Sequence, residues 1–391
     1  MKKFLGLALA IMLSLAPLAS ATEPLQFERI QLSDITYETA TAFDVNNNGI
    51  IDIISGAYWF EGPDFTTKHK IAEWRRVGDY YDNFSDFPMD VNGNGYTDLV
   101  VGGWFNQTLA WLENPKGQPG VQWKLHEVAH VGNIERNVFA DIDGDGVMEV
   151  FPTTNPVHMF RLKHDENGKG TGEFEQYTIR KGNGGHGFGV GDINGNGRVD
   201  IILAGGWLEA PEDPFDVDAW EWHPEFNLVM ASVPILVHDV NGNGKNDIIV
   251  GNAHGYGLYW YEQGVDSDGN RTWTQHLIDA HRSQYHDIRL VDIDNDGQME
   301  LVTGKRFRAH QGADPGAYDP LGIYYFKINN GEFNRVTLDY GPYTRASGAG
   351  IYFWVSDITG NGWKDVIAPG KEGTHLFINH GPLTGWRTTQ R

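Results

Sequence analysis

Short segments of alternating apolar and polar residues recur along the chain, and polar loops separate them. Residues 288–292 alternate in this way, residues 301–304 begin apolar, residues 257–262 are aromatic, and residues 273–278 alternate again. Alternation with a period of two over short runs, bounded by turn residues, predicts half-buried β-strands. Each repeating unit of this chain therefore predicts four short strands, named A to D in order.

A loop of fixed composition joins strands A and B of each unit. The copy at residues 292–300 reads DIDNDGQME, with oxygen-bearing side chains at positions 1, 3, 5 and 9 and glycine at position 6. Oxygens at alternate positions of a tight loop can converge on one hard cation, and glycine permits the sharp turn. The pattern therefore predicts calcium-binding DxDxDG-type loops.

The loop occurs seven times, with start-to-start spacings of 46, 51, 51, 47, 53 and 65 residues. A repeat of this length with four strands is typical of propellers, in which each repeat forms one sheet. We therefore predict an all-β fold, a seven-bladed β-propeller. The predicted calcium ligands, at positions 1, 3, 5 and 9 of the loops, are Asp44, Asn46, Asn48, Asp52, Asp90, Asn92, Asn94, Asp98, Asp141, Asp143, Asp145, Glu149, Asp192, Asn194, Asn196, Asp200, Asp239, Asn241, Asn243, Asp247, Asp292, Asp294, Asp296, Glu300, Asp357, Thr359, Asn361 and Asp365.

The first residues have the pattern of an export signal. Two lysines precede an apolar run that ends at residue 18, and small residues follow at 19–21. This pattern is typical of a secretory signal peptide, and the apolar run is too short to span a membrane. We expect a signal peptide at residues 1–21, a propeller over residues 22–391, and a periplasmic or secreted protein.

The segment after this signal supplies a strand that the last repeat lacks. Residues 27–32 alternate like a strand D, although they precede the first loop. The last repeat has a third strand at residues 374–379 and no convincing fourth. Pairing of these two segments would close the ring and remove an open sheet edge. We therefore expect residues 27–32 in the last blade.

Charge and composition restrict the partners. The formal net charge is −22, and much of the acidity lies in the seven loops, where bound calcium would offset it. Such a charge argues against a nucleic-acid partner. No segment after the signal is long and apolar enough to span a membrane. The chain has no cysteine, which excludes disulfides and thiolate metal sites. The oligomeric state stays open.

Candidate binding residues gather in the loops on one face of the predicted propeller. The A–B and C–D connections share one face, which carries the acids, whereas the B–C and D–A connections share the other. This second set of loops carries most of the histidines, arginines and tryptophans. Aromatic rings can stack on a sugar, and cations can bind its hydroxyls or carboxylates. The candidate saccharide-binding residues are Trp104, Trp207 and Arg345.

Two histidines share one unusual position. His186 and His286 each lie six residues before the first aspartate of their loop, where other blades carry residues as varied as Glu38, Phe84 and Val233. A structural need would not select histidine twice in so varied a set, so a functional role is favoured. Three histidines that share a position of strand D are instead expected to be structural: His69, His126 and His276. The candidate catalytic residues are His186, His254, His286, Tyr285, Lys305, Arg306 and His310.

The loops with their following strands resemble FG-GAP or VCBS repeats, which also form the propellers of integrin α-chains. This resemblance covers nearly the whole mature chain and implies the fold and the calcium, but no activity. A narrower resemblance rests on residues 185–192 (GHGFGVGD), 286–292 (HDIRLVD) and 304–310 (GKRFRAH), followed by Asp-Pro-Gly at 314–316. These segments are similar to the propeller domain of aldos-2-ulose dehydratase (1,5-anhydrofructose dehydratase) and related secreted bacterial proteins.

The dehydratase resemblance implies elimination of water from a keto-sugar with the aid of a bound metal ion. Propellers of similar size also serve as polysaccharide lyases of the ulvan-degrading kind, with histidine, tyrosine and arginine sites. Both comparisons therefore imply a carbohydrate substrate.

Two functions of different classes stay open. The first is a secreted carbohydrate lyase or dehydratase that catalyses β-elimination on a keto-sugar or a uronate-containing saccharide. A histidine or tyrosine would remove the α proton, and a cation would stabilise the enolate. That cation could be arginine, lysine, or a zinc or magnesium ion at the histidine cluster. The alternative is a non-catalytic propeller that binds carbohydrate or protein, because a fold does not imply chemistry. Three histidines near one channel mouth favour the enzyme.

Overall fold

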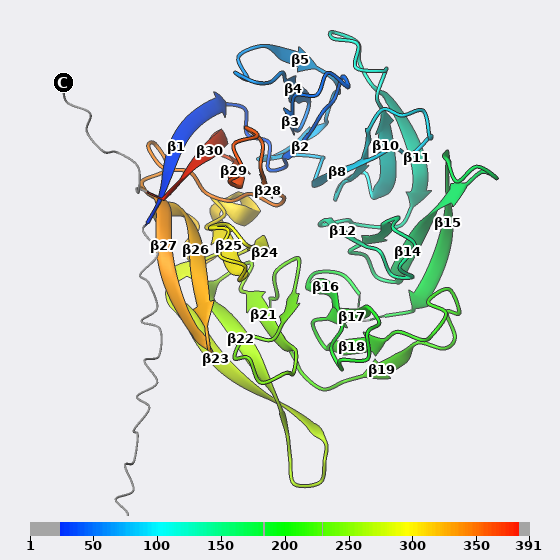
Figure 1. Ribbon diagram of the computed structural model, residues 1–391, viewed down its shortest axis with the longest axis vertical. Coiled ribbons are helices and arrows are strands. Elements are labelled where there is room, and N and C mark those ends of the chain that lie inside the picture. Colours follow the sequence, from blue (N-terminus) through cyan, green and yellow to red (C-terminus); the bar gives the residue numbers. More distant parts are fainter. Residues whose placement is uncertain (1–23, 183, 229, 383–391) are drawn as a thin grey trace, which may run out of the picture.

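The computed structural model describes residues 24–182, 184–228 and 230–382. This part of the chain is an all-β, seven-bladed propeller, with seven four-stranded sheets arranged in a ring (Figure 1). The expected signal peptide, residues 1–21, lies outside the described residues. Within the described part, no helix is long and apolar enough to cross a membrane.

The strands of each blade are taken in chain order from the axis of the ring outwards, except in the last blade (Figure 1). The strands are, in blade 1, β2 (Thr41–Phe43), β3 (Asp52–Ser55), β4 (Tyr58–Phe60) and β5 (Lys68–Lys70); in blade 2, β8 (Ser85–Met89), β9 (Asp98–Gly102), β10 (Thr108–Glu113) and β11 (Lys124–His130); in blade 3, β12 (Asn137–Ala140), β13 (Glu149–Pro152), β14 (Val157–His164) and β15 (Gly170–Arg180); in blade 4, β16 (Phe188–Gly191), β17 (Asp200–Leu203), β18 (Gly206–Glu209) and β19 (Glu221–His223); in blade 5, β20 (Leu236–His238), β21 (Asp247–Gly251), β22 (Tyr256–Val265) and β23 (Arg271–Ser283); in blade 6, β24 (Ile288–Val291), β25 (Glu300–Gly304), β26 (Leu321–Asn329) and β27 (Glu332–Gly341); and in blade 7, β28 (Trp354–Ser356), β29 (Asp365–Gly370), β30 (Gly373–Pro382) and β1 (Leu25–Ser33). A two-stranded hairpin, β6 (Arg76–Val77) and β7 (Tyr80–Tyr81), and one turn of 3-10 helix, η1 (Ala309–Gly312), lie in the connections.

The burial of each strand follows its sequence pattern. Every residue of β9, DLVVG, is buried, because neighbouring blades cover both faces of its sheet. The outermost strand β15 instead alternates between half-buried and exposed residues along most of its length. A short apolar strand near the axis and a long alternating strand at the rim are what the repeat pattern predicts.

The first strand of the chain belongs to the last blade. β1 pairs antiparallel with β30, with Phe27 opposite Asn379 and Arg29 opposite Phe377. The sheet order is β1-β30-β29-β28, and Figure 1 shows the blue β1 beside the red β30. The two ends of the described chain therefore share one sheet, which closes the ring.

Most of the apolar core of the described residues lies in seven clusters, one at each interface between neighbouring blades. Between blades 1 and 2, Ile54 and Trp59 pack with Leu99 and Leu112. Equivalent clusters fill the other six interfaces. Burial of each such side chain stabilises the fold by about 1.5–3 kcal/mol. Packing between blades thus fixes the ring, while inner-strand ends and connecting loops line its axis.

Four blades share a contact between their two outer strands. In blade 2, His126 stacks on Trp111 with ring centroids 4.2 Å apart, and its Nε2 lies 2.7 Å from Glu113 Oε2. The equivalent stacks, each with a glutamate hydrogen-bonded to the histidine, are Trp59–His69, Trp207–His223 and Trp260–His276. These histidines hold neighbouring strands together, which agrees with the structural role expected for His69, His126 and His276.

Candidate functional site

Three of the predicted histidines meet near the axis of the ring. His186 lies just before β16, His286 just before β24, and His254 follows β21. The Nε2 atoms of His186 and His254 are 3.0 Å apart, and the His286 ring lies 5.3 and 5.9 Å from the other two. One nitrogen from each ring lies within 4.8 Å of the other two. Separate blades thus deliver the three imidazoles to one point.

A carboxylate from the opposite side of the ring contacts His286. His286 is fully buried, and its Nε2 lies 2.7 Å from Oε1 of Glu135, which precedes β12 in blade 3. Burial would raise the pKa of Glu135, but the His286 hydrogen bond and the nearby Arg306 charge hold it well below its usual range. Burial lowers the pKa of His286, so this imidazole is neutral. An ionised Glu135 accepting from a neutral His286 fixes the orientation of the ring.

Arg306 links the same site to blades 1 and 7. Its Nε lies 2.9 Å from Glu38 Oε1, and its Nη1 lies 3.6 Å from Glu135 Oε1. Lys371 Nζ lies 2.9 Å from the other oxygen of Glu38. Burial alone would raise the pKa of Glu38, but the two cations lower it to about 2. All four side chains are buried, so these charges neutralise one another inside the protein.

One aspartate orients two stacked histidines. Asp314 lies 2.9 Å from Nδ1 of His254 and 2.9 Å from Nδ1 of His310, and the two rings stack at 4.4 Å. Burial opposes ionisation of Asp314, but the two histidine hydrogen bonds lower its pKa. A carboxylate can only accept, so the Nδ1 atom of each ring carries a proton and donates it to Asp314. Burial and the neighbouring His186 lower the pKa of His254 to about 4, which keeps its ring neutral.

A strained turn presents His310 to solvent. Arg308, His310 and Gln311 all have left-handed backbone conformations, with φ of 46°, 48° and 58°. The His310 backbone N–H donates to the Tyr80 hydroxyl at 2.6 Å, and its side chain is 57% exposed. Left-handed backbone is costly for residues other than glycine and persists where surrounding contacts impose it, often at functional sites. The turn therefore holds a reactive side chain in the open.

An aromatic cavity lies beside these histidines. It has a volume of about 350 Å³, within the range of small-molecule sites. Trp104 is 36% exposed and offers a face for stacking. The lining residues are Tyr80, Phe84, Trp104, Phe105, Glu135, Arg306, His310 and Gln311. The cavity can hold a small ring against aromatic faces with His310 at its edge.

The donor set of the three histidines fits a zinc-like ion. Two nitrogens bound to one tetrahedral zinc lie about 3.4 Å apart, close to the 3.0 Å between His186 and His254. Asp314 and Glu135 each contact one of the rings, as carboxylates behind metal-binding histidines do. His286 Nδ1 is buried without a hydrogen-bond partner, as expected of a nitrogen that serves as a ligand. Magnesium prefers oxygen ligands, so this set favours zinc among the two ions considered.

Two of the predicted catalytic residues lie outside this cluster. The Tyr285 side chain is fully buried in the core between blades 5 and 6, and its hydroxyl lies 3.0 Å from Asp279. Successive side chains of an extended segment point to opposite sides, so Tyr285 faces away where His286 faces in. Lys305 is also buried, and its Nζ donates to the Arg306 carbonyl at 2.9 Å. Burial lowers the pKa of Lys305 to about 8. Both side chains are therefore buried in the protein behind the histidine cluster and do not face the site.

Two of the predicted saccharide-binding residues also lie elsewhere. Trp207 is 0% exposed, stacks with His223, and has the Arg271 guanidinium 4.9 Å from its ring centre. It occupies the repeated tryptophan position of the outer strands, so it cannot stack on a sugar. The Arg345 side chain is exposed, but the Arg345 carbonyl accepts from Arg29 of the rim strand β1, away from the histidines. Only Trp104 of the three lines the cavity.

The sequence analysis did not select Glu38, Glu135, Asp314 or Tyr80. A signal for the first two was present, since Glu38 and Glu135 occupy the same position, six residues before a loop, as His186 and His286. Asp314 follows His310 by four residues in the Asp-Pro-Gly segment. No pattern along the chain marks Tyr80, whose contact with His310 joins residues 230 positions apart.

A family model and one solved structure agree with the propeller fold. A family model described as an FG-GAP-like repeat matches residues 90–151 and 239–303. BBS1N, solved in complex with ARL6DN, is 10% identical with a TM-score of 0.55, over 93% of this chain and 99% of that one. The exotype rhamnogalacturonan lyase YesX is 12% identical with a TM-score of 0.47, over 92% of this chain and 74% of that one.

An auxiliary nutrient-binding protein from Bacteroides ovatus is 11% identical with a TM-score of 0.46, over 80% of this chain and 75% of that one. No curated protein matches the sequence. At 10% identity the likeness to BBS1N concerns the fold alone. The chain is therefore a seven-bladed propeller with FG-GAP-like repeats.

Proposed function

We propose that this protein is a carbohydrate lyase or dehydratase that catalyses β-elimination on a saccharide, in the periplasm or outside the cell. The observation that carries the proposal is the joint placement of a three-histidine cluster, the His310–Asp314 pair and an aromatic cavity. Elimination needs a base, a cation for the enolate and a surface that holds the sugar. Each requirement has a candidate at this one place.

His310 is the proposed base. Its Nδ1–H is held by Asp314, so its Nε2 is free to take the proton from the carbon next to the substrate carbonyl. The electrons of that C–H bond form the new double bond, and the leaving oxygen departs from the β carbon with its bonding pair. Protonated His310 can then return the proton to this oxygen, which leaves as water or an alcohol. Asp314 stabilises the imidazolium between the two transfers.

The three-histidine cluster is the proposed site of a zinc-like ion, held by His186, His254 and His286. When bound, such an ion supplies a Lewis acid that stabilises the enolate charge. Burial lowers the pKa of His254 and His286 and keeps these imidazoles neutral, and the carboxylates behind the rings keep them oriented.

The charges around the cavity favour a keto-sugar over a uronate. Arg306 lines the cavity, but it already pairs with Glu38 and lies 3.6 Å from Glu135. Lys371 pairs with Glu38 as well. A substrate carboxylate would therefore have to compete with internal carboxylates for these cations, whereas a neutral sugar would stack on Trp104 without this conflict.

Product absorbance tests the proposal. Neutral keto-sugars and uronate-containing saccharides are incubated with the zinc-loaded protein, and absorbance is followed in the ultraviolet band of unsaturated carbonyl products. His186→Ala is expected to abolish product formation, whereas His276→Ala, in a rim contact, is expected to retain it. If the wild-type protein binds saccharide but forms no unsaturated product, the binding-propeller alternative replaces this proposal.

A further inference from the structure

Three aromatic rings form a cluster beside the histidine site. Phe307 and Tyr318 lie in the connection between β25 and β26, and Tyr343 lies in the connection between β27 and β28. Phe307 is buried and packs with Leu321 and Ala346. Tyr343 stacks on the Phe307 ring with centroids 5.0 Å apart, and Tyr318 meets the same ring edge-on at 6.3 Å. We call the two tyrosines on this buried base the tyrosine surface.

Both rings of the tyrosine surface are open to solvent. Tyr318 is 67% exposed and Tyr343 is 57% exposed, although each ring contacts Phe307. Single exposed apolar residues are common on protein surfaces and need no explanation. Aromatic rings that share one buried base form a patch instead, and exposed patches mark binding sites. The tyrosine surface is therefore a candidate binding surface.

The tyrosine surface continues the aromatic cavity along the turn that carries His310. His310 and Gln311 line the cavity together with Trp104. The next residue, Gly312, lies so close to Tyr318 that an added Cβ would be 2.3 Å from the tyrosine hydroxyl. The turn over residues 310–312 therefore borders the cavity at one end and the tyrosine surface at the other.

The charged groups next to the tyrosine surface are already paired. Arg308 Nη2 lies 3.2 Å from Asp79 Oδ2, and the Arg308 guanidinium lies 5.4 Å from the centre of the Phe307 ring. Asp319 directly follows one of the tyrosines in the chain and accepts from the Tyr256 hydroxyl at 2.6 Å. An ionic ligand would have to compete with these internal pairs, whereas a neutral ring can stack on an exposed tyrosine and hydrogen-bond to its hydroxyl. The surface therefore suits a neutral sugar.

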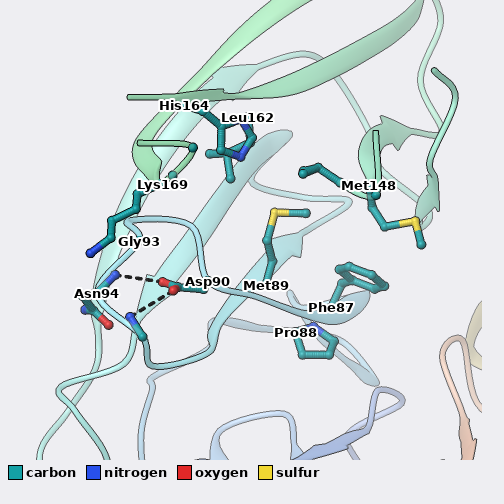
Figure 2. Close-up of a pocket in the computed structure, with 15 residues that line it drawn as sticks. Phe87, Pro88, Met89, Asp90, Gly93, Asn94, Met148, Leu162, His164 and Lys169 are labelled. Atoms are coloured by element: carbon teal, nitrogen blue, oxygen red, sulfur yellow. Dashed lines mark hydrogen bonds between the residues drawn. The ribbon is translucent and has the colours of Figure 1, made fainter. Parts of the chain in front are cut away.

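A larger pocket on the opposite face has a different lining (Figure 2). This pocket has a volume of about 570 Å³ and lies between the A–B loops of blades 2 and 3. Its Phe87 ring already stacks on Phe139, with centroids 3.7 Å apart, and Met148 and Leu162 form part of its apolar wall. Methionine and leucine present no flat ring to a sugar, so the histidine face is the better surface for a saccharide.

We infer that the tyrosine surface is a second sugar-binding site and that the ligand is a neutral oligosaccharide. One sugar unit lies in the aromatic cavity, and the next unit lies on Tyr318 and Tyr343. The inference rests on the proposed function for the class of ligand, and it adds the length of that ligand and the place of each unit.

This placement also specifies the leaving group of the proposed reaction, because the bond between the two sugar units then lies beside His310. His310 takes the α proton from the sugar in the cavity, and the electrons of that C–H bond form the new double bond. The bond between the β carbon and the bridging oxygen breaks, and the oxygen departs with its bonding pair and the second sugar. Protonated His310 returns the proton to this oxygen, so the second product is a sugar alcohol group and not water.

Binding to immobilised glycans tests the inference without turnover. Neutral mono-, di- and trisaccharides of the common hexoses and pentoses are placed on one array, and the full chain is applied after loading with zinc. The wild-type protein is expected to retain disaccharides or trisaccharides and to bind the matching monosaccharides about tenfold more weakly. Tyr318→Ala with Tyr343→Ala is expected to remove this difference. Tyr340→Ala, at 56% exposure in the outermost strand β27, is the matched control and is expected to bind like the wild type.

A second variant separates loss of the rings from a change in the fold. Tyr318→Phe with Tyr343→Phe keeps both rings and is expected to retain the preference for oligosaccharides. A wild-type protein that retains no glycan, equal affinity for mono- and oligosaccharides, or an alanine variant with wild-type affinities would overturn the inference. Product absorbance is a separate readout. If oligosaccharides bind through the tyrosines and no unsaturated product forms, the second sugar-binding site stands and the proposed elimination falls.

Discussion

His286 of blade 6 and Glu135 of blade 3 meet across the axis of the ring, with Nε2 and Oε1 2.7 Å apart. The next residue of each segment forms a second pair, between Asp287 and Arg136. Two blades that are not neighbours are therefore bridged twice. The first bridge orients an imidazole of the candidate site, and the second lies behind it as a structural tie.

Replacing Glu135 by glutamine is expected to weaken the histidine site without unfolding the propeller. The change removes the charge that fixes the His286 tautomer, and loss of such a carboxylate usually lowers metal affinity about 10–100-fold. Zinc affinity measured by competition with a chelator dye checks this result. Glu127→Gln, on the exposed face of β11, is the control and is expected to leave zinc affinity unchanged. Equal zinc affinities of the Glu135 variant and the wild type would contradict the orienting role.

Removal of one partner of the second bridge is expected to be strongly destabilising. Arg136 and Asp287 are both buried, so Arg136→Met leaves the Asp287 charge with only the longer Arg289 contact, at 3.5 Å, and costs up to about 3–5 kcal/mol. Asp287→Asn in the same chain removes that charge and keeps an acceptor for the Phe353 N–H, so it is expected to restore part of the loss. Urea unfolding of the single and double variants measures the difference. A double variant that is less stable than Arg136→Met would contradict this account.

Two buried histidines predict a loss of stability in mild acid. Burial, with a second charge nearby, lowers the pKa of both His254 and His375 to about 4. In the unfolded chain a histidine has a pKa of about 6.5, so between these values the unfolded state binds more protons. The contribution of each neutral ring to stability is therefore complete above pH 6.5 and is lost toward pH 4, by up to about 3 kcal/mol for each group.

The contribution of the two histidines to stability is lost in a different pH range from that of Glu38. The pKa of Glu38 is lowered to about 2, so its contribution is lost only as pH falls below its ordinary value of 4.5. Burial raises the pKa of carboxyls such as Asp98 and Glu149 to about 7, so they also titrate between pH 7 and 4.5 and oppose this loss. The histidine effect is therefore the difference in melting temperature between the wild type and His375→Gln, both measured in chelator. His375→Gln lies outside the metal cluster and is expected to reduce the slope. A pH profile of the melting temperature that His375→Gln leaves unchanged would contradict the neutral, buried state of that ring.

Aromatic substitutions separate the cavity from the core. Trp104→Ala is expected to weaken saccharide binding, because sugar stacking on an exposed ring is lost, and to change the free energy of unfolding little. Trp207→Ala is expected to destabilise the fold by about 3–5 kcal/mol, since its ring is buried. Tyr285→Phe is expected to cost about 1 kcal/mol and to leave activity intact. If a folded Tyr285→Phe variant lost saccharide binding, Tyr285 would have to be counted as a residue of the binding site.

Much of the fold could be predicted because its signals are local. Seven loops with glycine at a fixed position, and strands of period two between them, define seven sheets without any knowledge of long-range contacts. The place of β1 could be predicted because the last repeat lacked a fourth strand, and the strand-like segment before the first loop belonged to no repeat. Apolar packing between neighbouring sheets then fixes the ring, and no further sequence signal is needed to predict it.

The site was predictable only where topology decides position. His186, His254 and His286 lie in connections that the strand order sends to one face, so their meeting follows from the fold. The direction of a side chain within a loop depends on contacts that no local pattern records. Tyr285, predicted to be catalytic, therefore turns into the core. Trp207, predicted to bind saccharide, stacks on His223 instead, and the repeated Trp-x-Glu of the outer strands marked this position. The role of Asp314 could be recognised only from the folded structure, because its partner His254 lies 60 residues away in the sequence.

The most direct test of the central claim measures binding and turnover on one variant, His310→Ala, with the same saccharide. If His310 transfers the proton, its removal is expected to lower kcat by about 10²–10⁴-fold, the usual contribution of a positioned acid–base group. Saccharide affinity, set by the aromatic cavity, is expected to change little, and isothermal titration calorimetry measures it independently. Asp314→Asn is expected to lower kcat in the same direction by a smaller factor. A His310→Ala variant with wild-type turnover, or a wild-type protein that binds the saccharide and never converts it, would contradict the claim.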